Sequence, residues 1–558
     1  MMCVFARPMS ARSREYVHVS REEGAMRSSG SSIRRNDADA RVYGCNLAIM
    51  LAAIRSAAVL GIDAYNVTVE VDVALGLPQW VIVGLPASAV KESRERVSAA
   101  LINAGFTVPS RRITVNLAPA DVRKEGTAFD LPIALGVLVG TGCVDVAAVA
   151  RCVVVGELGL DASIRPVRGA LSIARKLAAT EAKNSWTLVL PPANVPEASL
   201  VRGLALAAPS SLGELVSWLR VGKCPVPVSE PGVLPPQDLL DLADVAGQEG
   251  AKRALAIAAA GSHGLLLVGP PGAGKTMLAR RLPTILPALT NAEALEVTAV
   301  HSVAGMLDAA AGAVTRRPFR APHHSISTAG LVGGGSSPRP GEVSLAHNGV
   351  LFLDELLEFP RSVLEALRQP MEDGSVTISR AHASLKFPAR FALTAAMNPC
   401  LCGFAGDPTR VCTCAAAEIV KYRGRLSGPL ADRIDLHVNV PAVALAKLSE
   451  RDTGEGSATI RDRVQLARAR QRARYSSDSA CNARAPGRWL EMHGGVESSA
   501  RELLTNAGER LHLSARAFHR VLRVARTIAD LEQNMTIESA HVAEALGYRP
   551  RLEGEPRS

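Results

Sequence analysis

One short stretch near the middle of the chain restricts its fold more than any other. The apolar residues 265–268 precede this stretch and a helical pattern follows it. The stretch itself reads Gly269, Pro270, Pro271, Gly272, Ala273, Gly274, Lys275 and Thr276. This is a complete phosphate-binding P-loop in the strand-to-helix context that the motif needs. Its backbone N–H groups curve around phosphates, Lys275 reaches the terminal phosphates, and Thr276 ligates Mg²⁺. The sequence therefore predicts an α/β core that binds ATP and Mg²⁺.

A second apolar run, residues 350–353, ends in two acids, Asp354 and Glu355. We expect this run to be a buried parallel strand. Asp354 is predicted to hold Mg²⁺, and Glu355 to orient and polarise the attacking water. Because a protein that only binds nucleotide needs no second carboxylate, this pair favours hydrolysis.

A further strand, expected at residues 391–396, leads to Asn398. The amide of Asn398 is placed to contact the attacking water or the γ-phosphate. The alternative is an asparagine that forms a turn before Pro399.

With these motifs the chain resembles the AAA+ superfamily. Asn398 matches sensor 1, Arg433 within residues 429–435 matches the arginine finger, and Arg516 within residues 513–516 matches sensor 2. The resemblance implies that Arg433 neutralises charge on the γ-phosphate of a neighbouring subunit, which requires sites at subunit interfaces. We therefore expect a homo-hexameric ring. For Arg433 the alternative is a surface ion pair with Asp432 or Asp435.

A distinctive block lies between the two nucleotide motifs. Residues 317–325 read RPFRAPHHS, and a glycine-rich stretch covers residues 330–341. Together with the Asn-Pro-Cys sequence at 398–400, this block resembles the magnesium-chelatase-like ATPases and, within them, the ComM/YifB family, over residues 51–550. The resemblance implies a Lon-protease-like N-terminal domain of the ribosomal S5 type, a parallel-sheet AAA+ module with a helix-2 insert, and a C-terminal helical lid.

Within that block, adjacent histidines on a strand face opposite ways, so His323 and His324 are expected to make a poor metal chelate. The neighbouring Arg317 and Arg320 suit a phosphodiester backbone.

The length of the chain predicts an α/β protein of several domains, because 558 residues exceed what one hydrophobic core holds. Residues 1–49 are Arg- and Ser-rich with little apolar periodicity, which predicts a disordered tail or an extension upstream of the natural start. The five prolines in 224–237 predict a stiff linker. We expect the Lon-like domain at 50–223, the AAA+ ATPase domain at 238–441 and the lid at 442–558.

Charge and apolar runs indicate partners and compartment. The net charge of +10 favours a polyanion such as nucleic acid, although a solvated basic surface would give the same value. The best apolar run near the start, residues 47–60, is interrupted by Arg55 and is too short to span a bilayer. With no secretory signal and mostly scattered cysteines, we expect a cytoplasmic protein without a membrane partner.

The family resemblance implies a helicase-like motor that drives branch migration of DNA recombination intermediates during natural transformation. Aromatic residues make up 4% of the chain, which argues against extensive base stacking, so binding to branched or single-stranded DNA should be independent of sequence.

Two alternatives are an ATP-dependent Lon-like protease or protein remodeller, and a magnesium chelatase motor subunit. Proteolysis needs a Ser-Lys dyad, but the matching positions hold Ala128 and Leu171, with Thr127 one residue away. The chelatase motor acts with separate subunits that this chain does not supply.

Four cysteines, Cys400, Cys402, Cys412 and Cys414, form a C-x-C-x9-C-x-C pattern. Four thiolates could hold Zn²⁺ tetrahedrally. The usual spacing is C-x2-C, however, and tight C-x-C pairs strain a site for one ion, so buried or redox-sensitive thiols remain the alternative.

Six arginines fall in a helix-compatible stretch between residues 461 and 474, and they predict either a solvated basic face or a contact with the DNA backbone.

Overall fold

The computed structural model describes residues 51–180, 186–222, 240–308, 312–335, 338–380, 383–407, 410–443, 454–477 and 480–549. The tail expected at 1–49 and the linker expected at 224–237 lie outside these residues. Among the described helices, none combines the length and the apolar character that a bilayer crossing requires.

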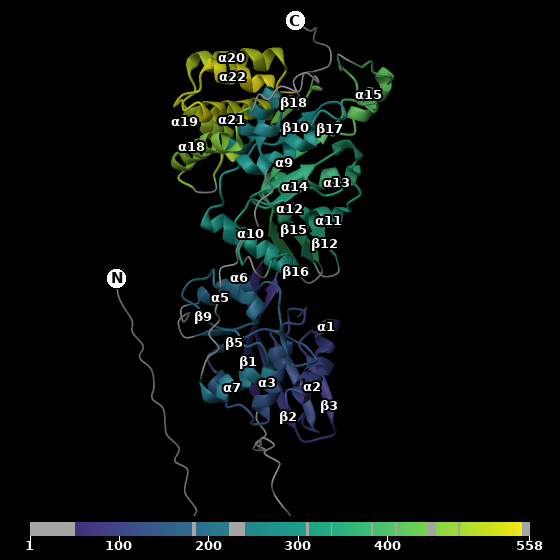
Figure 1. Ribbon diagram of the computed structural model, residues 1–558, viewed down its shortest axis with the longest axis vertical. Helices are drawn as coiled ribbons and strands as arrows, with labels where there is room; N and C mark the ends of the chain where they lie inside the picture. Colours follow the sequence, from purple (N-terminus) through teal and green to yellow (C-terminus); the bar gives the residue numbers. More distant parts are fainter. Residues whose placement is uncertain are drawn as a thin grey trace, which may run out of the picture. The chain divides into compact units, whose positions relative to one another are not determined.

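The N-terminal part of the described chain forms a seven-stranded sheet in the order β3-β4-β2-β1-β5-β8-β9 (Figure 1). Its strands are β1 (Ala52–Leu60), β2 (Asp63–Ala74), β3 (Gln79–Val83), β4 (Arg112–Ala118), β5 (Cys152–Val154), β8 (Thr187–Val189) and β9 (Ala205–Ala207). The valines at alternate positions of β2 are buried, as the period of a half-buried strand requires. β1 and β2 pair antiparallel, whereas β5, β8 and β9 run parallel.

Helices pack on this sheet, and a two-stranded β6–β7 ribbon lies beside it. The helices are α1 (Ser88–Lys91), α2 (Ser93–Asn103), α3 (Asp130–Gly140), α4 (Val146–Val149), α5 (Ala170–Ala178), α6 (Val195–Ala198) and α7 (Leu212–Val221); the ribbon strands are β6 (Glu157–Leu158) and β7 (Ile164–Arg165). Every residue of α3 is buried, which fits a helix that is apolar on all sides. It contacts both β1 and β2.

The expected parallel sheet is present in the middle of the chain. It has five strands in the order β11-β14-β17-β10-β18, and each pair runs parallel. The strands are β10 (Leu265–Val268), β11 (Phe319–Arg320), β14 (Val350–Leu353), β17 (Ala392–Met397) and β18 (Leu436–Asn439). Because β10, β14 and β17 are neighbours in register, their carboxyl ends meet at one edge. That edge carries the P-loop, the two acids and Asn398.

Two helices flank the P-loop strand, α8 (Glu249–Gly261) before it and α9 (Lys275–Ile285) after it. Between α9 and β14 the chain adds α10 (Asn291–Ala304), α11 (Thr328–Val332), β12 (Gly333–Gly334), β13 (Arg339–Pro340) and α12 (Glu342–Leu345). Thr290 and Glu293 start α10 with a capping box.

After β14 come α13 (Arg361–Ala366), α14 (Arg368–Asp373) and an antiparallel hairpin of β15 (Ser375–Arg380) and β16 (Ala383–Pro388).

The C-terminal part is helical in its described residues. It comprises α18 (Ser457–Tyr475), α19 (Gly487–His493), α20 (Ser498–Arg510), α21 (Ala515–Leu531) and α22 (Ser539–Gly547), preceded by α15 (Ala416–Arg423) and α16 (Gly428–Ala431). Helices α18 and α21 pack on α8 and share its hydrophobic core. Figure 1 shows these helices, in yellow-green to yellow, beside β10 and β18.

Candidate nucleotide-binding site

The P-loop turns between β10 and α9 by way of glycines with positive φ. Gly272 has a φ of 78° and Gly274 a φ of 87°, conformations that glycine adopts without strain. Gly269 lies so close to β18 that an added Cβ would stand 2.1 Å from the Val440 carbonyl oxygen. The strand, the turn and the helix start therefore need the small residues that the motif supplies. The backbone is shaped to place N–H groups around phosphates at the start of α9.

Lys275 is almost fully buried within this loop. Its ammonium donates to the carbonyl oxygens of Gly269 and Pro270 at 2.8 and 2.9 Å. It also donates to Asn398 Oδ1 at 3.0 Å. Burial lowers the pKa of Lys275, while the carboxylates of Asp354 and Glu355 act in the opposite direction. The predicted P-loop lysine and the predicted sensor 1 residue are thus in direct contact.

Thr276 and Asp354 converge in the same way. The Thr276 hydroxyl donates to Asp354 Oδ2 at 2.7 Å, although the two residues are 78 positions apart. A hydroxyl and a carboxylate are oxygen ligands of the kind that Mg²⁺ prefers. The donor set at this point therefore fits the magnesium ion that the sequence predicts.

Glu355 stands beside this pair in an unusual backbone conformation. Its φ is 50°, a left-handed value that non-glycine residues rarely adopt and that is often found at functional sites. The Glu355 side chain is 61% exposed, and its carboxylate lies 3.5 Å from His324 Nδ1. The acid therefore projects from the protein surface next to the magnesium ligands.

The sequence did not indicate that His324 lies beside the Glu355 carboxylate. The rings of His323 and His324 are 4.1 Å apart at their centroids rather than on opposite faces, because the strand ends at Arg320 and both histidines lie in the loop beyond it.

Arg433 lies away from the P-loop of its own chain. The Arg433 carbonyl oxygen is 3.3 Å from the Cβ position of Gly264, just before β10, whereas the P-loop follows that strand. The five residue-to-residue steps from Gly264 to Gly269 span about 16 Å of extended chain. Arg433 is thus at the opposite edge of the sheet from the P-loop of its own chain.

Arg433 belongs to a group of arginines, Arg368, Arg433, Arg516 and Arg520, which we call the arginine cluster. Burial lowers the pKa of Arg433, and the charges of Arg368, Arg520 and Arg516 lower it further. The guanidinium pairs with Glu372, not with Asp432 or Asp435, and donates to the Pro429 carbonyl at 2.6 Å. Nothing in the sequence identified Arg368, Arg520 or Glu372, because they come from separate segments.

The two arginines offered as phosphodiester contacts are held within the chain. Arg317 donates to Glu293 at 2.9 Å and to the Asn348 carbonyl at 2.7 Å. Arg320 forms a two-point pair with Glu342 at 2.6 and 2.7 Å. The charges of both arginines are therefore balanced by Glu293 and Glu342 of the same chain.

Several arginines of α18 also have partners within the chain. Arg468 donates to the Ala259 carbonyl oxygen, Arg461 donates to the Thr284 carbonyl oxygen, and Arg474 pairs with Asp530. The helix is a packing element on α8 and α9 rather than a uniformly solvated basic face.

In the N-terminal sheet, the positions matched to a Lon dyad hold no reactive groups. The Ala128 carbonyl accepts a hydrogen bond from Gly156, and Leu171 is fully buried in α5. The Thr127 hydroxyl donates to Glu157. Nearby in sequence, Lys124 is buried, and its ammonium has no hydrogen-bond partner among the described residues. The Ser-Lys dyad of a Lon-type protease is therefore missing from these matched positions.

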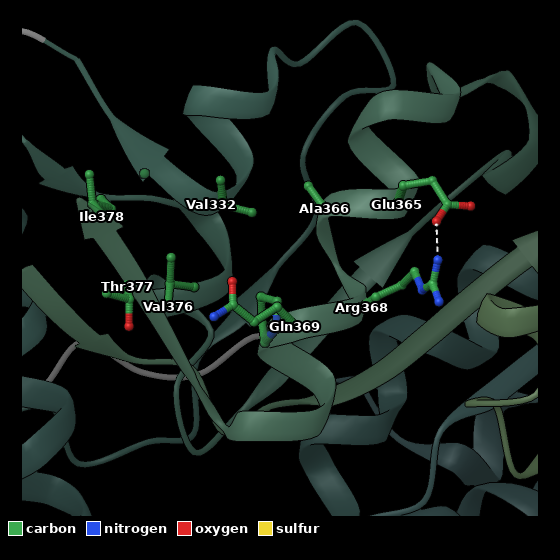
Figure 2. Close-up of a pocket in the computed structure, with 10 residues that line it drawn as sticks. Val332, Glu365, Ala366, Arg368, Gln369, Val376, Thr377 and Ile378 are labelled. Atoms are coloured by element: carbon green, nitrogen blue, oxygen red, sulfur yellow. Dashed lines mark hydrogen bonds and ion pairs between the residues drawn. The ribbon is translucent and has the colours of Figure 1, made fainter. Parts of the chain in front are cut away.

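A pocket of about 530 Å³ opens between α13, α14 and the β15 strand (Figure 2). Glu365 and Arg368, paired at 2.8 Å, lie at one end, and Val376 and Ile378 line the other. Neither the P-loop residues 269–276 nor the two acids Asp354 and Glu355 line this pocket. Since Arg368 also belongs to the arginine cluster, this pocket adjoins that cluster rather than the nucleotide motifs.

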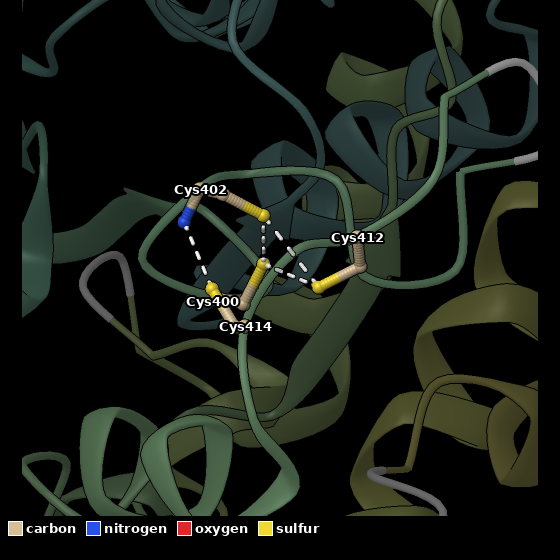
Figure 3. A group of neighbouring side chains, drawn as sticks. All are labelled: Cys400, Cys402, Cys412 and Cys414. Carbon is tan, nitrogen blue, oxygen red and sulfur yellow. Dashed lines mark hydrogen bonds between the residues drawn. The ribbon is translucent and has the colours of Figure 1, made fainter.

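Beyond Asn398 the chain forms a loop that gathers the four cysteines predicted as a cluster (Figure 3). Their sulfur atoms all lie within 4.8 Å of one another. Backbone N–H groups of Phe404 and Thr413 lower the pKa of Cys402 to about 5. Among the described residues, no other group of three or more His, Cys, Asp or Glu side chains comes together closely enough to hold a metal ion.

Comparison with protein families gives three matches. Residues 241–448 match the family described as magnesium chelatase, subunit ChlI. Residues 69–194 match the family described as subunit ChlI of Mg-chelatase, and residues 454–549 match the ChlI C-terminal family.

Among curated relatives, competence protein ComM of Haemophilus influenzae is 45% identical over 507 residues, which cover 89% of this chain and 97% of ComM. The protein YifB of Salmonella typhimurium is 43% identical over 504 residues, with 89% and 97% covered. The magnesium-chelatase 38 kDa subunit of Cereibacter sphaeroides is 26% identical over 174 residues, with 28% of this chain and 51% of that subunit covered.

Proposed function

The chain belongs to the ComM/YifB family of magnesium-chelatase-like AAA+ ATPases, and on this premise we propose that it is a hexameric motor that hydrolyses ATP to move branched DNA. The observation that supports hydrolysis most strongly is the convergence of two hydrogen-bonded pairs, Lys275 with Asn398 and Thr276 with Asp354, beside Glu355. These residues come from three strand ends, and each presents the group that phosphoryl transfer needs.

In this proposal Lys275 and the loop N–H groups bind and orient the phosphates of ATP. Thr276 and Asp354 hold Mg²⁺, which supplies charge neutralisation at the phosphate oxygens. Glu355 accepts a proton from the attacking water, and its exposed carboxylate leaves room for that water. Asn398 bonds to Lys275 and so couples the terminal phosphate to the end of β17.

The position of the arginine cluster supports a ring. Arg433 does not reach the P-loop of its own chain, because the length of β10 separates the two, and the charge of Arg516 acts on Arg433. In a ring, the cluster of one subunit faces the nucleotide of the next, and its positive charge stabilises the charge that develops on the γ-phosphate. Glu372 would release Arg433 to that role when the neighbour docks. We assign Arg433 as the arginine finger and Arg516 as a sensor 2 residue that acts from the same side.

DNA is the proposed substrate. ComM carries the name competence protein, and 97% of its length is matched by this chain. The net charge of +10 suits a phosphate backbone, which attracts basic proteins without sequence readout. We propose branch migration of recombination intermediates during natural transformation, in the cytoplasm. A zinc ion at the four cysteines would have a structural role and would not take part in the phosphoryl transfer.

We propose the domain limits in the same way: a Lon-like domain at 50–223, the ATPase domain at 238–441 and a helical lid at 442–558. The alternatives to a DNA motor are less well supported. Ala128 and Leu171 provide neither nucleophile nor base for proteolysis. The chelatase subunit of Cereibacter sphaeroides covers only 28% of this chain.

The test is the rate of ATP hydrolysis by the purified chain alone, then with single-stranded, duplex and four-way-junction DNA, and then with an unfolded protein. Stimulation by DNA supports the motor. Stimulation only by unfolded protein, with release of peptides, supports a protease, and stimulation only by chelatase partner subunits supports metal insertion.

A further inference from the structure

The cysteine loop between β17 and α15 has a geometry that its sequence spacing did not indicate. The sulfur atoms of Cys400 and Cys402 are 3.3 Å apart, and Cys412 Sγ lies 3.5 Å from Cys402 Sγ and 3.6 Å from Cys400 Sγ. Cys414 completes the group within the 4.8 Å limit. The four sulfurs therefore lie together, although the C-x-C spacing was expected to strain a site for one ion.

We propose that Cys400, Cys402, Cys412 and Cys414 bind one Zn²⁺ and that this ion fixes the loop against the P-loop. Four thiolates at about 2.3 Å from a tetrahedral ion stand about 3.8 Å from each other. The three measured sulfur separations lie within half an ångström of that value. A small local adjustment would bring all four sulfurs to the ion.

Hydrogen bonds from the backbone support the same assignment. The Cys402 N–H donates to Cys414 Sγ at 3.3 Å, and the Ala405 N–H donates to Cys400 Sγ at 3.2 Å. Donors of this kind orient thiolate ligands and reduce the charge that four of them would place together. A cluster of thiols without a metal would gain little from such donors.

The other uses of four cysteines fit less well. A disulfide needs sulfurs at about 2.05 Å, whereas the closest pair here is 3.3 Å apart. An iron–sulfur cluster places several atoms between its thiolate ligands, so the cysteines would stand further apart than around a single ion. All four sulfurs converge on a space suited to one ion, and a sulfur-only tetrahedral set is typical of zinc.

This loop also touches the nucleotide motifs. An added Cβ on Gly403 would stand 2.5 Å from Pro271 Cδ, so the loop backbone packs directly on the P-loop. Cys400 follows Asn398 after one residue, and Arg423 at the end of α15 donates to the Pro399 carbonyl at 3.0 Å. Zinc would therefore hold the segment that positions Asn398 against Lys275. This consequence rests on the proposed ATPase function, whereas zinc binding does not.

The first measurement is the metal content of the full chain. The protein is purified without metal-affinity steps, and its metals are quantified by inductively coupled plasma mass spectrometry. We expect one zinc ion per chain. The double variant Cys402→Ser/Cys412→Ser should hold zinc at least about tenfold more weakly, since loss of an outer-shell partner alone costs that much. The matched control is Cys481→Ser, which removes a buried cysteine that lies outside the cluster and should keep the zinc.

A second readout needs no variant. Replacing the metal with Co²⁺ should give the thiolate-to-metal absorption and the ligand-field bands of a tetrahedral four-sulfur site. Iron in place of zinc, no bound metal, a cobalt spectrum without sulfur ligands, or unchanged zinc in the double variant would each overturn the proposal. If the double variant does not fold, the wild-type zinc content and cobalt spectrum decide.

The link to Asn398 is tested separately. Removal of zinc should lower kcat for ATP hydrolysis by about 10- to 100-fold, as loss of support around a metal site does elsewhere. Zinc bound as expected but without any effect of its removal on kcat would refute the link and leave the metal site intact. A chain that binds zinc but hydrolyses no ATP under any condition would instead contradict the proposed function.

Discussion

Lys275 and Thr276 are adjacent in the chain but face different partners. The ammonium of Lys275 contacts loop carbonyls and Asn398, whereas the hydroxyl of Thr276 contacts Asp354. The Glu355 backbone N–H donates to Asp354 Oδ1, but its side chain joins neither set of bonds and is mostly exposed. Substitutions at Lys275 and Glu355 should therefore separate the binding of ATP from its hydrolysis.

We expect Lys275→Ala to weaken ATP binding by about 10- to 100-fold or more, because it removes charge-assisted hydrogen bonds to the phosphates. Glu355→Gln should keep the affinity but lower turnover by about 10²- to 10⁴-fold, the contribution of a general base. Calorimetric titration gives the affinity and phosphate release gives the turnover. Glu358→Gln, an exposed acid three residues further on, is the control and should behave as wild type. Normal turnover in either site variant would remove the assignment.

The sequence could indicate that these residues lie together for a physical reason. A P-loop, an acidic strand end and a polar strand end each carry their chemistry within a few adjacent residues, and a parallel sheet brings such ends to one edge. The arginine cluster could not be predicted as a group. Arg433 and Arg516 approach each other only in the folded chain, where Arg520 of the same helix lies 3.9 Å from Asp435 just before β18, and no local pattern records that contact.

A buried polar network joins the C-terminal helices α18 and α21. Asp530 on α21 is fully buried and accepts from Arg474 of α18 and from Arg526 one turn before it. Helical spacing of the α18 arginines predicted a basic face but could not show which of them would meet a buried carboxylate. The network extends through Asn482 and Thr527 to His263 at the start of β10.

Asp530→Asn should destabilise these helices strongly, since breaking a buried ion pair leaves uncompensated charge at a cost of about 3–5 kcal/mol. Thermal unfolding followed by the fluorescence of Trp489, which lies in α19, should show an earlier transition. Asp462→Asn removes an exposed carboxylate from α18 and should change the stability by less than about 0.5 kcal/mol. Equal unfolding curves for the two variants would show that the network contributes little.

In the proposed ring, the subunits complete one another's nucleotide sites. The P-loop and Arg433 lie at opposite edges of one sheet, so under that proposal each chain would contribute the P-loop to one site and Arg433 to the next. The length of β10 was visible in the sequence, but the contact between Arg433 and Gly264 at the amino end of that strand was not.

Arg433→Ala should bind ATP normally and lose most hydrolysis. Mixing it with Lys275→Ala should restore part of the activity, because some interfaces in mixed rings then combine an intact P-loop with an intact arginine. The measurement is phosphate release across mixing ratios, with each variant alone as the control. If no ratio recovers activity above the sum of the two variants, the site is not shared between subunits.

Binding to DNA should depend on salt and hardly on base sequence. Each duplex phosphate that is neutralised releases counterions, so log K should fall with log salt at a slope of about −0.9 per contact. Fluorescence anisotropy on junctions of equal structure and different sequence gives both dependences. A flat salt dependence, or a strong preference among sequences, would disagree with a charge-driven contact.

Whether the protein moves branched DNA is tested most directly with a synthetic four-way junction whose strands are labelled. With ATP and Mg²⁺, the wild-type protein should convert the junction to its strand products. Conversion should disappear with Lys275→Ala or with a non-hydrolysable ATP analogue. If wild-type rings hydrolyse ATP rapidly but neither bind nor remodel any junction from low to physiological salt, the DNA-motor account is wrong and remodelling of a protein substrate replaces it.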